Sequence, residues 1–227
     1  MAVTRHHPQW KKTQIRGVLF DMDGLVLDTE KLYTRFWMEA AADLGHPMTL
    51  TQALQMRSLG SIESQAKLDS FFGSGVLEYD VLRNRRIELM EAFIAEHGIE
   101  EKKGIRELLA CLKEKGIPCA ITSSSSIPLI RRHLGDLGLL DGFTALSTGK
   151  DVPQGKPAPD SYLHGAATLG IAPEHCLAIE DSPAGIEAAW RAGCMAVSVP
   201  DQDQPDGEVL SRSFARADSL LDVMELL

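Results

Sequence analysis

The sequence is short of positive charge. Its 227 residues include 23 lysines and arginines against 32 aspartates and glutamates, which gives a formal net charge of −9 at pH 7. Binding to a nucleic acid or to an anionic membrane needs a basic face, so neither class of partner is expected. A small phosphorylated ligand remains compatible with this charge, because a metal ion and one or two basic side chains can reverse the field inside a cleft.

Cysteine is scarce as well, and long apolar runs are absent. The four cysteines are too far apart for a Cys-x-x-Cys motif, and we interpret them as buried reduced thiols of a cytoplasmic protein. No apolar run approaches the roughly 20 residues of a membrane span. Residues 1–14 are polar and lack the apolar stretch of a secretory signal, so we predict a loose leader there.

What the chain does contain is an alternation of short apolar segments and helical ones in its C-terminal half. The predicted strands lie near residues 117–122, 143–147, 177–179 and 195–199, and the helices include residues 159–169 and 182–191. This alternation is typical of parallel βαβ units. We therefore predict an α/β fold with a Rossmann-like, doubly wound parallel sheet as its core.

Residues 30–98 interrupt this alternation. Leu32, Phe36, Ala40 and Leu44 follow helical spacing, and no βαβ pattern is visible in the segment. We predict an inserted helical module at residues 30–98 and a core formed by residues 15–29 together with 99–227.

Two aspartates follow the first predicted strand, which is the apolar run at residues 18–20. Asp21 and Asp23 would repel each other, and a divalent cation would remove this conflict. Asp21 can act as a nucleophile without deprotonation, while Asp23 is placed to protonate a leaving oxygen and later to activate water. Gly24 allows a tight turn beside a substrate. A solvated turn at the strand end is the alternative interpretation.

Three further groups lie at predicted strand ends or in stiff loops. The hydroxyl groups of Thr122 and Ser123, with nearby backbone N–H groups, are suited to binding an oxyanion. Lys156 lies between a glycine and a proline and can neutralise a phosphate. Glu180 and Asp181 suit Mg²⁺, which binds few carboxylates and keeps several waters. A polar loop, an exposed lysine and a helix cap are the ordinary alternatives.

In their order along the chain, these residues resemble the four motifs of the haloacid dehalogenase superfamily of phosphohydrolases. The resemblance covers about residues 15–227, and its motifs are Asp21-Met22-Asp23-Gly24, Thr122, Lys156 and Glu180-Asp181. It implies that Asp21 forms a phospho-aspartate and that Asp23 is the acid/base. It also implies that Mg²⁺ binds to Asp21, Glu180, Asp181 and the backbone carbonyl of Asp23. Residues 30–98 would be the cap that closes over a small-molecule substrate and excludes water.

Several branches of this superfamily remain to be distinguished. Carbon–halogen cleavage needs neither an acid nor a metal, so Asp23 and the acidic pair argue against a dehalogenase. The chain also looks similar to β-phosphoglucomutases and to pseudouridine-5′-phosphatase-like enzymes. The mutases carry a basic residue in the cap loop, which corresponds to residues 58–63 of this chain; the only base near that loop is Arg57, which is not at the expected position. The mutases also carry a histidine early in the first cap helix, where this chain has Tyr33. Both departures favour a phosphatase, and a sugar-phosphate mutase remains the alternative.

We therefore expect a cytoplasmic, monomeric, Mg²⁺-dependent phosphatase of a small phosphorylated metabolite, such as a sugar phosphate or a nucleoside monophosphate. Tyr33, Phe36, Trp37 and Arg57 are the candidates for the substrate-facing side of the cap. Packing inside the helical module is the alternative role for the three aromatic residues.

Overall fold

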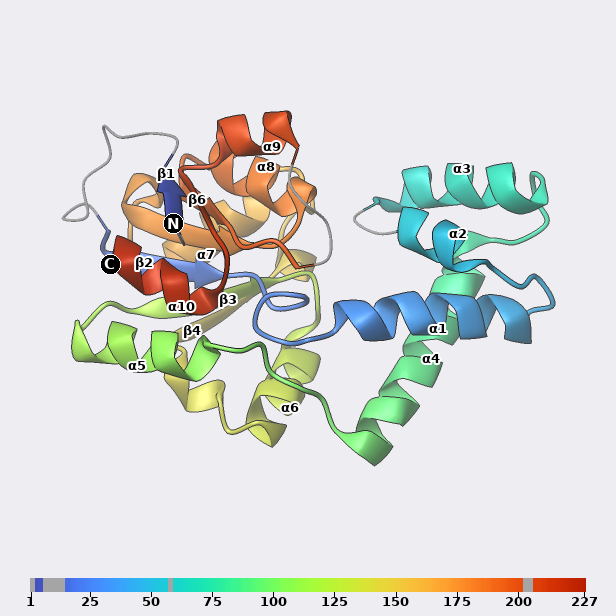
Figure 1. The fold of residues 1–227 in the computed structure, drawn as a ribbon, viewed down its shortest axis with the longest axis horizontal. Coiled ribbons are helices and arrows are strands. Elements are labelled where there is room, and N and C mark those ends of the chain that lie inside the picture. The colour runs from blue at the N-terminus through green and yellow to red at the C-terminus, as the bar shows by residue number, and fades with distance from the viewer. Residues whose placement is uncertain (1–2, 6–14, 57–58, 202–205) are drawn as a thin grey trace. The chain divides into compact units, whose positions relative to one another are not determined.

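A computed structural model of the protein describes residues 3–5, 15–56, 59–201 and 206–227. The chain divides into two compact units (Figure 1). Residues 1–28 and 100–227 form the first, which we call the core unit, and residues 29–99 form the second, which we call the helical unit. The predicted boundaries of the inserted module, 30 and 98, differ from this division by one residue at each end.

The core unit is built around a seven-stranded sheet in the order β1-β7-β6-β5-β2-β3-β4. Neighbouring strands from β7 to β4 run parallel, and β1 pairs antiparallel with β7. The strands are β1 (Val3–Arg5), β2 (Gly17–Phe20), β3 (Cys119–Ser123), β4 (Ala145–Thr148), β5 (Cys176–Glu180), β6 (Met195–Ser198) and β7 (Ala215–Ala217). The predicted α/β class and its doubly wound parallel sheet are thereby confirmed.

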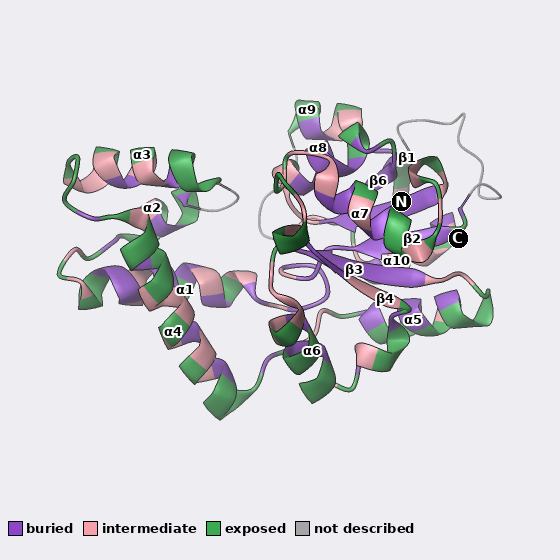
Figure 2. Ribbon diagram, turned by 180° about the vertical axis from the view of Figure 1, so that it is seen from behind, coloured by how far each residue is buried: buried purple, intermediate pink, exposed green. Residues whose placement is uncertain are grey.

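Helices cover both faces of this sheet (Figure 1). Helices α7 and α8 pack on one face, and α5, α6 and α10 lie on the other. The helices are α5 (Ile105–Glu114), α6 (Ile127–Asp136), α7 (Asp160–Leu169), α8 (Pro183–Arg191), α9 (Gly207–Arg212) and α10 (Leu220–Val223). Short 3-10 turns lie at Leu140–Gly142, Gly149–Asp151, Pro173–His175 and Met224–Leu226. Because both faces are covered, strands β2, β3, β5 and β6 are buried along their whole length, as continuous apolar runs require (Figure 2).

The sequence sets the ends of the helices beside the sheet. Ser182 precedes α8, and its hydroxyl oxygen accepts a hydrogen bond from the backbone N–H of Gly185 at 3.1 Å. Pro183 occupies the first helical position, where its missing N–H costs nothing. Helix α7 ends at Gly170, whose φ of +68° lies in the left-handed region that favours glycine. These ends agree with the predicted helices at residues 159–169 and 182–191 to within a residue.

The change of strand order positions the carboxyl ends of β2 and β5 side by side. From β2 the chain continues to β3 and β4 on one side, and it later forms β5, β6 and β7 on the other. Phe20 on β2 pairs with Ile179 on β5, so the residues that follow each of them are neighbours. Such a topological switch point is where sheets of this kind bind their ligands.

The prediction of a loose leader at residues 1–14 does not hold for Val3–Arg5, which form β1. Strand β7 would otherwise expose the unpaired backbone groups of a sheet edge, and β1 satisfies them. Residues 6–14 lie outside the described part of the chain.

The helical unit consists of α1 (Glu30–Asp43), α2 (Leu50–Gln55), α3 (Ser61–Phe72) and α4 (Tyr79–His97). Helices α1 and α4 pack against each other, and an apolar cluster that includes Trp37, Ala40 and Leu82 fills the unit. Leu32, Phe36 and Ala40 are buried, as the helical spacing of the sequence predicts. No helix in the described ranges is long and apolar enough to cross a membrane.

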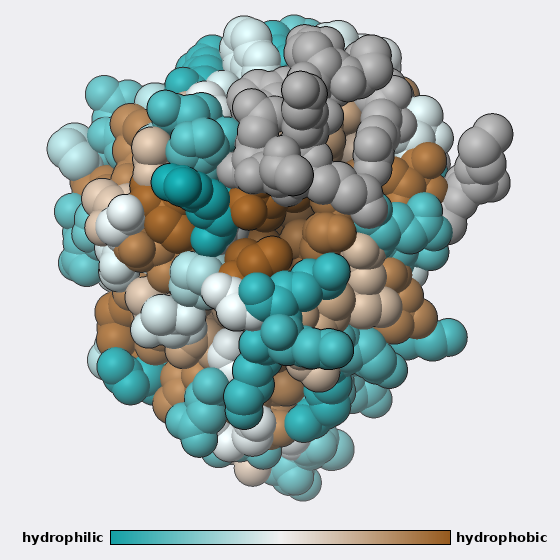
Figure 3. All heavy atoms as spheres, turned by 90° about the vertical axis from the view of Figure 1, so that its left-hand side faces the viewer, coloured by the Kyte–Doolittle hydropathy of each residue, from teal (hydrophilic) through white to brown (hydrophobic). Residues whose placement is uncertain are grey.

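The face of the molecule shown in Figure 3 is mixed in character. Hydrophilic side chains border the hydrophobic ones on the face shown in Figure 3. Apolar atoms normally make up a large part of a protein surface, so this mixture does not by itself mark a binding site.

The four cysteines are free, and three of them are buried. Burial raises the pKa values of Cys119 and Cys176 to about 11. Because the thiolate is the reactive form, these two thiols are unreactive at neutral pH.

Candidate active site

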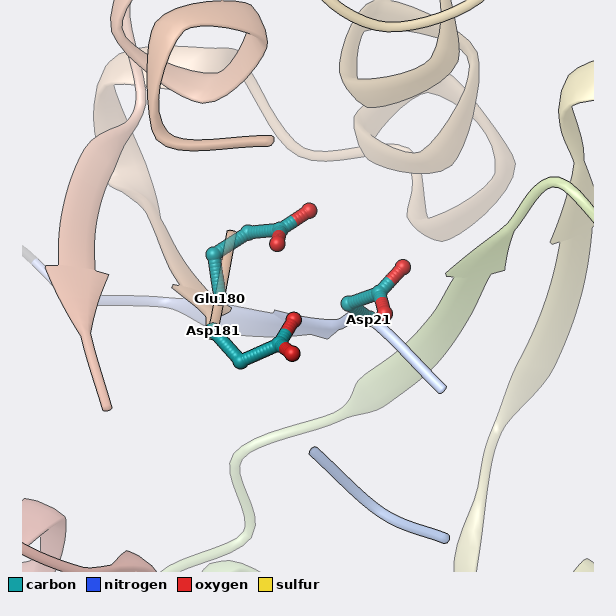
Figure 4. A group of neighbouring side chains, drawn as sticks. All are labelled: Asp21, Glu180 and Asp181. Carbon is teal, nitrogen blue, oxygen red and sulfur yellow. The ribbon is translucent and has the colours of Figure 1, made fainter. Parts of the chain in front are cut away.

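Three carboxyl groups meet at the switch point. Asp21 follows β2, Glu180 ends β5, and Asp181 comes next. One carboxylate oxygen from each lies within 4.8 Å of the others. Figure 4 shows the three side chains directing their carboxyl groups into the same space from the two strand ends. Asp21 is 9% exposed and Glu180 is fully buried, so negative charge is concentrated where water screens it poorly.

Lys156 supplies positive charge to this cluster. Its Nζ donates to Asp21 Oδ1 at 2.5 Å, to Glu180 Oε1 at 2.6 Å and to the carbonyl oxygen of Thr122 at 3.2 Å. These three acceptors use all three N–H donors of the ammonium group. The lysine side chain is only 10% exposed. Lys156 is therefore a positioned charge, which argues against the alternative of an ordinary exposed loop lysine.

The charges of the cluster perturb one another. Burial raises the pKa of Asp21 to about 8; Lys156 opposes this effect, while the neighbouring carboxylates of Glu180 and Asp23 add to it. Burial alone would lower the pKa of Lys156, but Asp21 and Glu180 raise it above its ordinary value. The lysine thus stays charged and does not fully offset the surrounding acids. A cation bound at this point would remove the remaining conflict.

A tight turn holds Asp23 close to Asp21. Gly24 has a φ of +81°, which favours glycine, and its N–H donates to the carbonyl oxygen of Leu27 at 2.9 Å. The hydroxyl of Ser125, from the loop after β3, lies 3.4 Å from Asp23 Oδ2. This turn and the loop of residues 123–126, which we call the serine loop, together position the second aspartate of the motif.

The two candidate hydroxyl groups at the end of β3 differ in their surroundings. A Cβ on Gly165 of α7 would lie 2.5 Å from Thr122 Oγ1, so the threonine side chain lies against that helix. Thr122 Oγ1 is buried and has no hydrogen-bond partner in the described structure. Ser123 is also buried, but its Oγ accepts a hydrogen bond from the N–H of Ser125 at 3.0 Å. Thr122 therefore contacts the cluster through its carbonyl oxygen, which accepts from Lys156, and not through its hydroxyl. Of the two candidate hydroxyl groups, only that of Ser123 belongs to the serine loop.

Other polar contacts of the cluster were not indicated by the sequence. The Tyr162 hydroxyl donates to Glu180 Oε1 at 2.6 Å. Ser182 donates to Glu180 Oε2 from its hydroxyl at 3.0 Å and from its backbone N–H at 3.3 Å. Ser182 could be predicted only as a helix cap, and Tyr162 only as one more residue of the helix after Lys156.

The candidate residues of the helical unit are described within that unit alone. The guanidinium of Arg86, on α4, lies 4.5 Å from the ring centroids of both Tyr33 and Trp37 on α1. Phe36 and Trp37 are buried, which agrees with the alternative of packing inside the helical unit. Arg86 was not predicted, because its aromatic neighbours are distant in sequence. Arg57 lies outside the described residues.

Residues 15–193 match the family model of the haloacid dehalogenase-like hydrolases. The chain belongs to this family. The predicted family is thereby confirmed, as is the prediction that the protein is a hydrolase.

Individual relatives cover most of the chain. Hexitol phosphatase A of Escherichia coli is 35% identical over 81% of this chain and 82% of its own length. A β-phosphoglucomutase of Bacillus subtilis is 32% identical over 84% of this chain and 85% of its own length. A solved structure of CbbY from Rhodobacter sphaeroides, in complex with phosphate, superposes with a TM-score of 0.71 at 26% identity, covering 92% of this chain and 96% of that one.

The contrast between Thr122 and Ser123 leads to a prediction about stability. Thr122→Val replaces a buried hydroxyl that has no described partner with a methyl group, so we expect the free energy of unfolding to stay level or to rise by about 1 kcal/mol. Ser123→Ala removes the acceptor of the Ser125 N–H, so we expect the free energy of unfolding to fall by about 1 kcal/mol. Urea unfolding of both variants measures this difference, and a marked loss of stability in Thr122→Val would contradict the placement of its side chain.

The raised pKa of Asp21 predicts how stability depends on pH without added cation. Its pKa is about 8 in the folded protein against a usual value of 3.8, so between these values the folded state retains a proton that the unfolded chain has lost. The folded state is therefore destabilised as pH rises through this interval. Asp21→Asn cannot titrate, and its stability should fall less between about pH 5 and pH 8 than that of the wild type.

Urea midpoints measured in EDTA across this range test that expectation. Asp141→Asn is the matched control, because it removes an exposed carboxylate from the same unit and should keep the wild-type slope. Parallel curves for Asp21→Asn and the wild type would show that Asp21 does not carry the effect.

Proposed function

We propose that the protein is a Mg²⁺-dependent phosphatase of a small phosphorylated metabolite, a sugar phosphate or a nucleoside monophosphate, and that it works through a phospho-aspartate at Asp21. One observation carries this proposal. A buried aspartate at the switch point of the sheet contacts a fixed lysine at 2.5 Å and lies within 4.8 Å of two further carboxylate oxygens. This combines a nucleophile with positive charge for the phosphate and with ligands for a cation.

In this mechanism Asp21 attacks phosphorus as a carboxylate, the form that the charge of Lys156 favours and that a bound cation would favour further, and the bond from phosphorus to the leaving alcohol oxygen breaks. Asp23 donates a proton to that oxygen. Asp23 then accepts a proton from a water molecule, which attacks the phosphorus of the phospho-aspartate and releases phosphate. Lys156 offsets charge on the phosphoryl group while remaining protonated throughout.

Donors for the phosphoryl oxygens come from the turn and the serine loop. The backbone N–H groups near Gly24 and the hydroxyl of Ser123 are our candidates, since donors placed where charge develops contribute strongly to catalysis. Thr122 contributes through its carbonyl contact with Lys156. Its hydroxyl, which lies against α7, has no role in this proposal.

The acidic cluster fits a divalent cation. Its donors are all oxygen, which is the ligand type of Mg²⁺. Asp21 and Asp181 would hold the ion, together with the backbone carbonyl of Asp23, and Glu180 lies beside them. When bound, Mg²⁺ would supply the charge that orients the phosphate and offsets the carboxylates.

The named relatives support the class of reaction and of substrate. Hexitol phosphatase A is by its name a phosphatase of sugar alcohol phosphates, which agrees with the predicted enzyme class, a phosphoric monoester hydrolase. We propose in addition that the helical unit serves as the cap, with Tyr33 and Arg57 as its substrate residues, and that the enzyme is a monomer.

A sugar-phosphate mutase is the second candidate, because a β-phosphoglucomutase is 32% identical over 84% of the chain. A mutase would return the phosphoryl group from Asp21 to a sugar hydroxyl instead of transferring it to water. Tyr33 stands where these mutases carry a histidine, and this favours the phosphatase.

Two substitutions in the turn test the proposed function. Asp21→Asn removes the nucleophile and Asp23→Asn removes the acid/base, so each should lower the turnover of p-nitrophenyl phosphate with Mg²⁺ by about a thousandfold or more. Thr122→Val and Asp141→Asn are controls that should keep turnover near the wild-type level. Circular dichroism would check that all four variants are folded.

Normal turnover by Asp21→Asn would refute the proposal. Incubation of the wild type with hexose monophosphates then separates the two candidates. Released inorganic phosphate supports the phosphatase, whereas an isomeric sugar phosphate without released phosphate would establish the mutase.

A further inference from the structure

The carboxylate of Glu180 is already saturated with protein donors. Lys156 Nζ and the Tyr162 hydroxyl both donate to Oε1 at 2.6 Å. The hydroxyl and the backbone N–H of Ser182 donate to Oε2 at 3.0 and 3.3 Å. A carboxylate offers about four lone-pair positions, and these four donors use them. The carboxylate of Glu180 therefore has no lone pair left over for a cation in this arrangement.

The surroundings of Glu180 keep it in this position. A Cβ on Gly185, in the first turn of α8, would lie 1.9 Å from Glu180 Oε1 and 2.1 Å from Oε2. The carboxylate thus rests against the backbone of the helix start, in a space that any larger residue at position 185 would fill. Negative charge is favoured at that end of a helix, where the backbone N–H groups are exposed.

Tyr162 links Glu180 to the lysine. It is fully buried on α7, and Lys156 Nζ lies 5.0 Å from the centroid of its ring. The tyrosine therefore contacts both partners of the ion pair, one through its hydroxyl and the other through its ring. A phenylalanine would keep the ring contact and lose only the hydrogen bond to Glu180.

The partner of Glu180 in the acidic pair is oriented differently. Asp181 follows the last residue of β5, and its side chain leaves the backbone on the other side from that of Glu180, although a carboxylate oxygen of each still lies within 4.8 Å of the other (Figure 4). Figure 4 shows the carboxyl group of Asp181 directed toward that of Asp21. The two acidic residues of the motif are thus placed for different tasks.

We propose that Tyr162 is a positioning residue, which together with Ser182 commits Glu180 to holding Lys156 against Asp21, so that Glu180 is not a cation ligand. Asp21 and Asp181 then carry the cation. This inference rests on the proposed function and divides the acidic pair into an anchor for the lysine and a ligand for the metal.

The variant Tyr162→Phe tests the role of the hydroxyl. Without it Glu180 and Lys156 are held less firmly, and the kcat for p-nitrophenyl phosphate should fall by about tenfold while KM changes little. The dissociation constant of Mg²⁺, measured by calorimetry without substrate, should stay within about threefold of the wild-type value. An unchanged kcat would show that the Tyr162 hydroxyl has no positioning role and that the residue only packs. A tenfold weaker binding of Mg²⁺ would show that Glu180 contributes to the cation site. Either result overturns the proposal.

The matched pair Glu180→Gln and Asp181→Asn tests the division directly. Each removes one negative charge from neighbouring positions at the end of β5. Mg²⁺ binding should weaken by about tenfold or more in Asp181→Asn and by less than about threefold in Glu180→Gln. The reverse order, or an equal loss in both, contradicts the inference, as does a wild-type protein that binds no Mg²⁺.

The proposed function fails in a different way. A wild-type protein that hydrolyses no phosphate ester would refute it while the order of the Mg²⁺ affinities still stood. If Glu180→Gln does not fold, Tyr162→Phe still tests the inference, because it removes a single hydroxyl and no charge.

Discussion

The contact of Lys156 with Asp21 and Glu180 is the interaction on which the rest of the site depends. The motifs place four acidic residues near two strand ends, and Asp21 and Glu180 are buried there. Buried like charges are costly unless they are compensated. Lys156 compensates them in part, and the raised pKa of Asp21 indicates the charge that remains. The same imbalance makes the site suitable for a phosphate and a cation, which bring opposite charges to it.

The fold makes this arrangement possible through its strand order. Asp21 and Glu180 are far apart in the sequence and meet because β2 and β5 are neighbours at the switch point, and the loop before α7 brings Lys156 to both of them. The apolar strands behind them are buried on both faces and form a rigid support. A strained or charged arrangement persists only where its surroundings hold it, and here the sheet, the first turn of α8 and Tyr162 do so.

Much of the fold and of the candidate site could be predicted from the sequence, because the motif residues lie at strand ends and parallel strands end at a common edge of the sheet. The α/β class, the helix ends near Ser182 and Gly170, and the aspartate turn followed from local patterns. The side on which a strand residue points was harder to judge. Thr122 and Ser123 are adjacent, so only one of them can face the serine loop, and the pattern of residue types did not show which.

The contacts that escaped prediction depend on long-range packing. The role of Tyr162 becomes visible only when α7 packs on the sheet and the tyrosine hydroxyl meets Glu180. In the same way, Arg86 gains its aromatic neighbours only when α4 packs on α1. Likewise, Val3–Arg5 are polar enough to suggest a loose end, and they become a strand because β7 offers an open edge. No local pattern in the sequence reports such partners.

The central claim, that Asp21 carries the phosphoryl group, is tested most directly by trapping that intermediate. The Asp23→Asn variant should still be phosphorylated by p-nitrophenyl phosphate, whose leaving group needs no acid, and should release phosphate slowly because water is not activated. Acid quenching followed by mass spectrometry should then find the peptide that contains Asp21 heavier by one phosphoryl group. A phosphoryl group on any other residue, or continued release of nitrophenol by Asp21→Asn, would contradict the account.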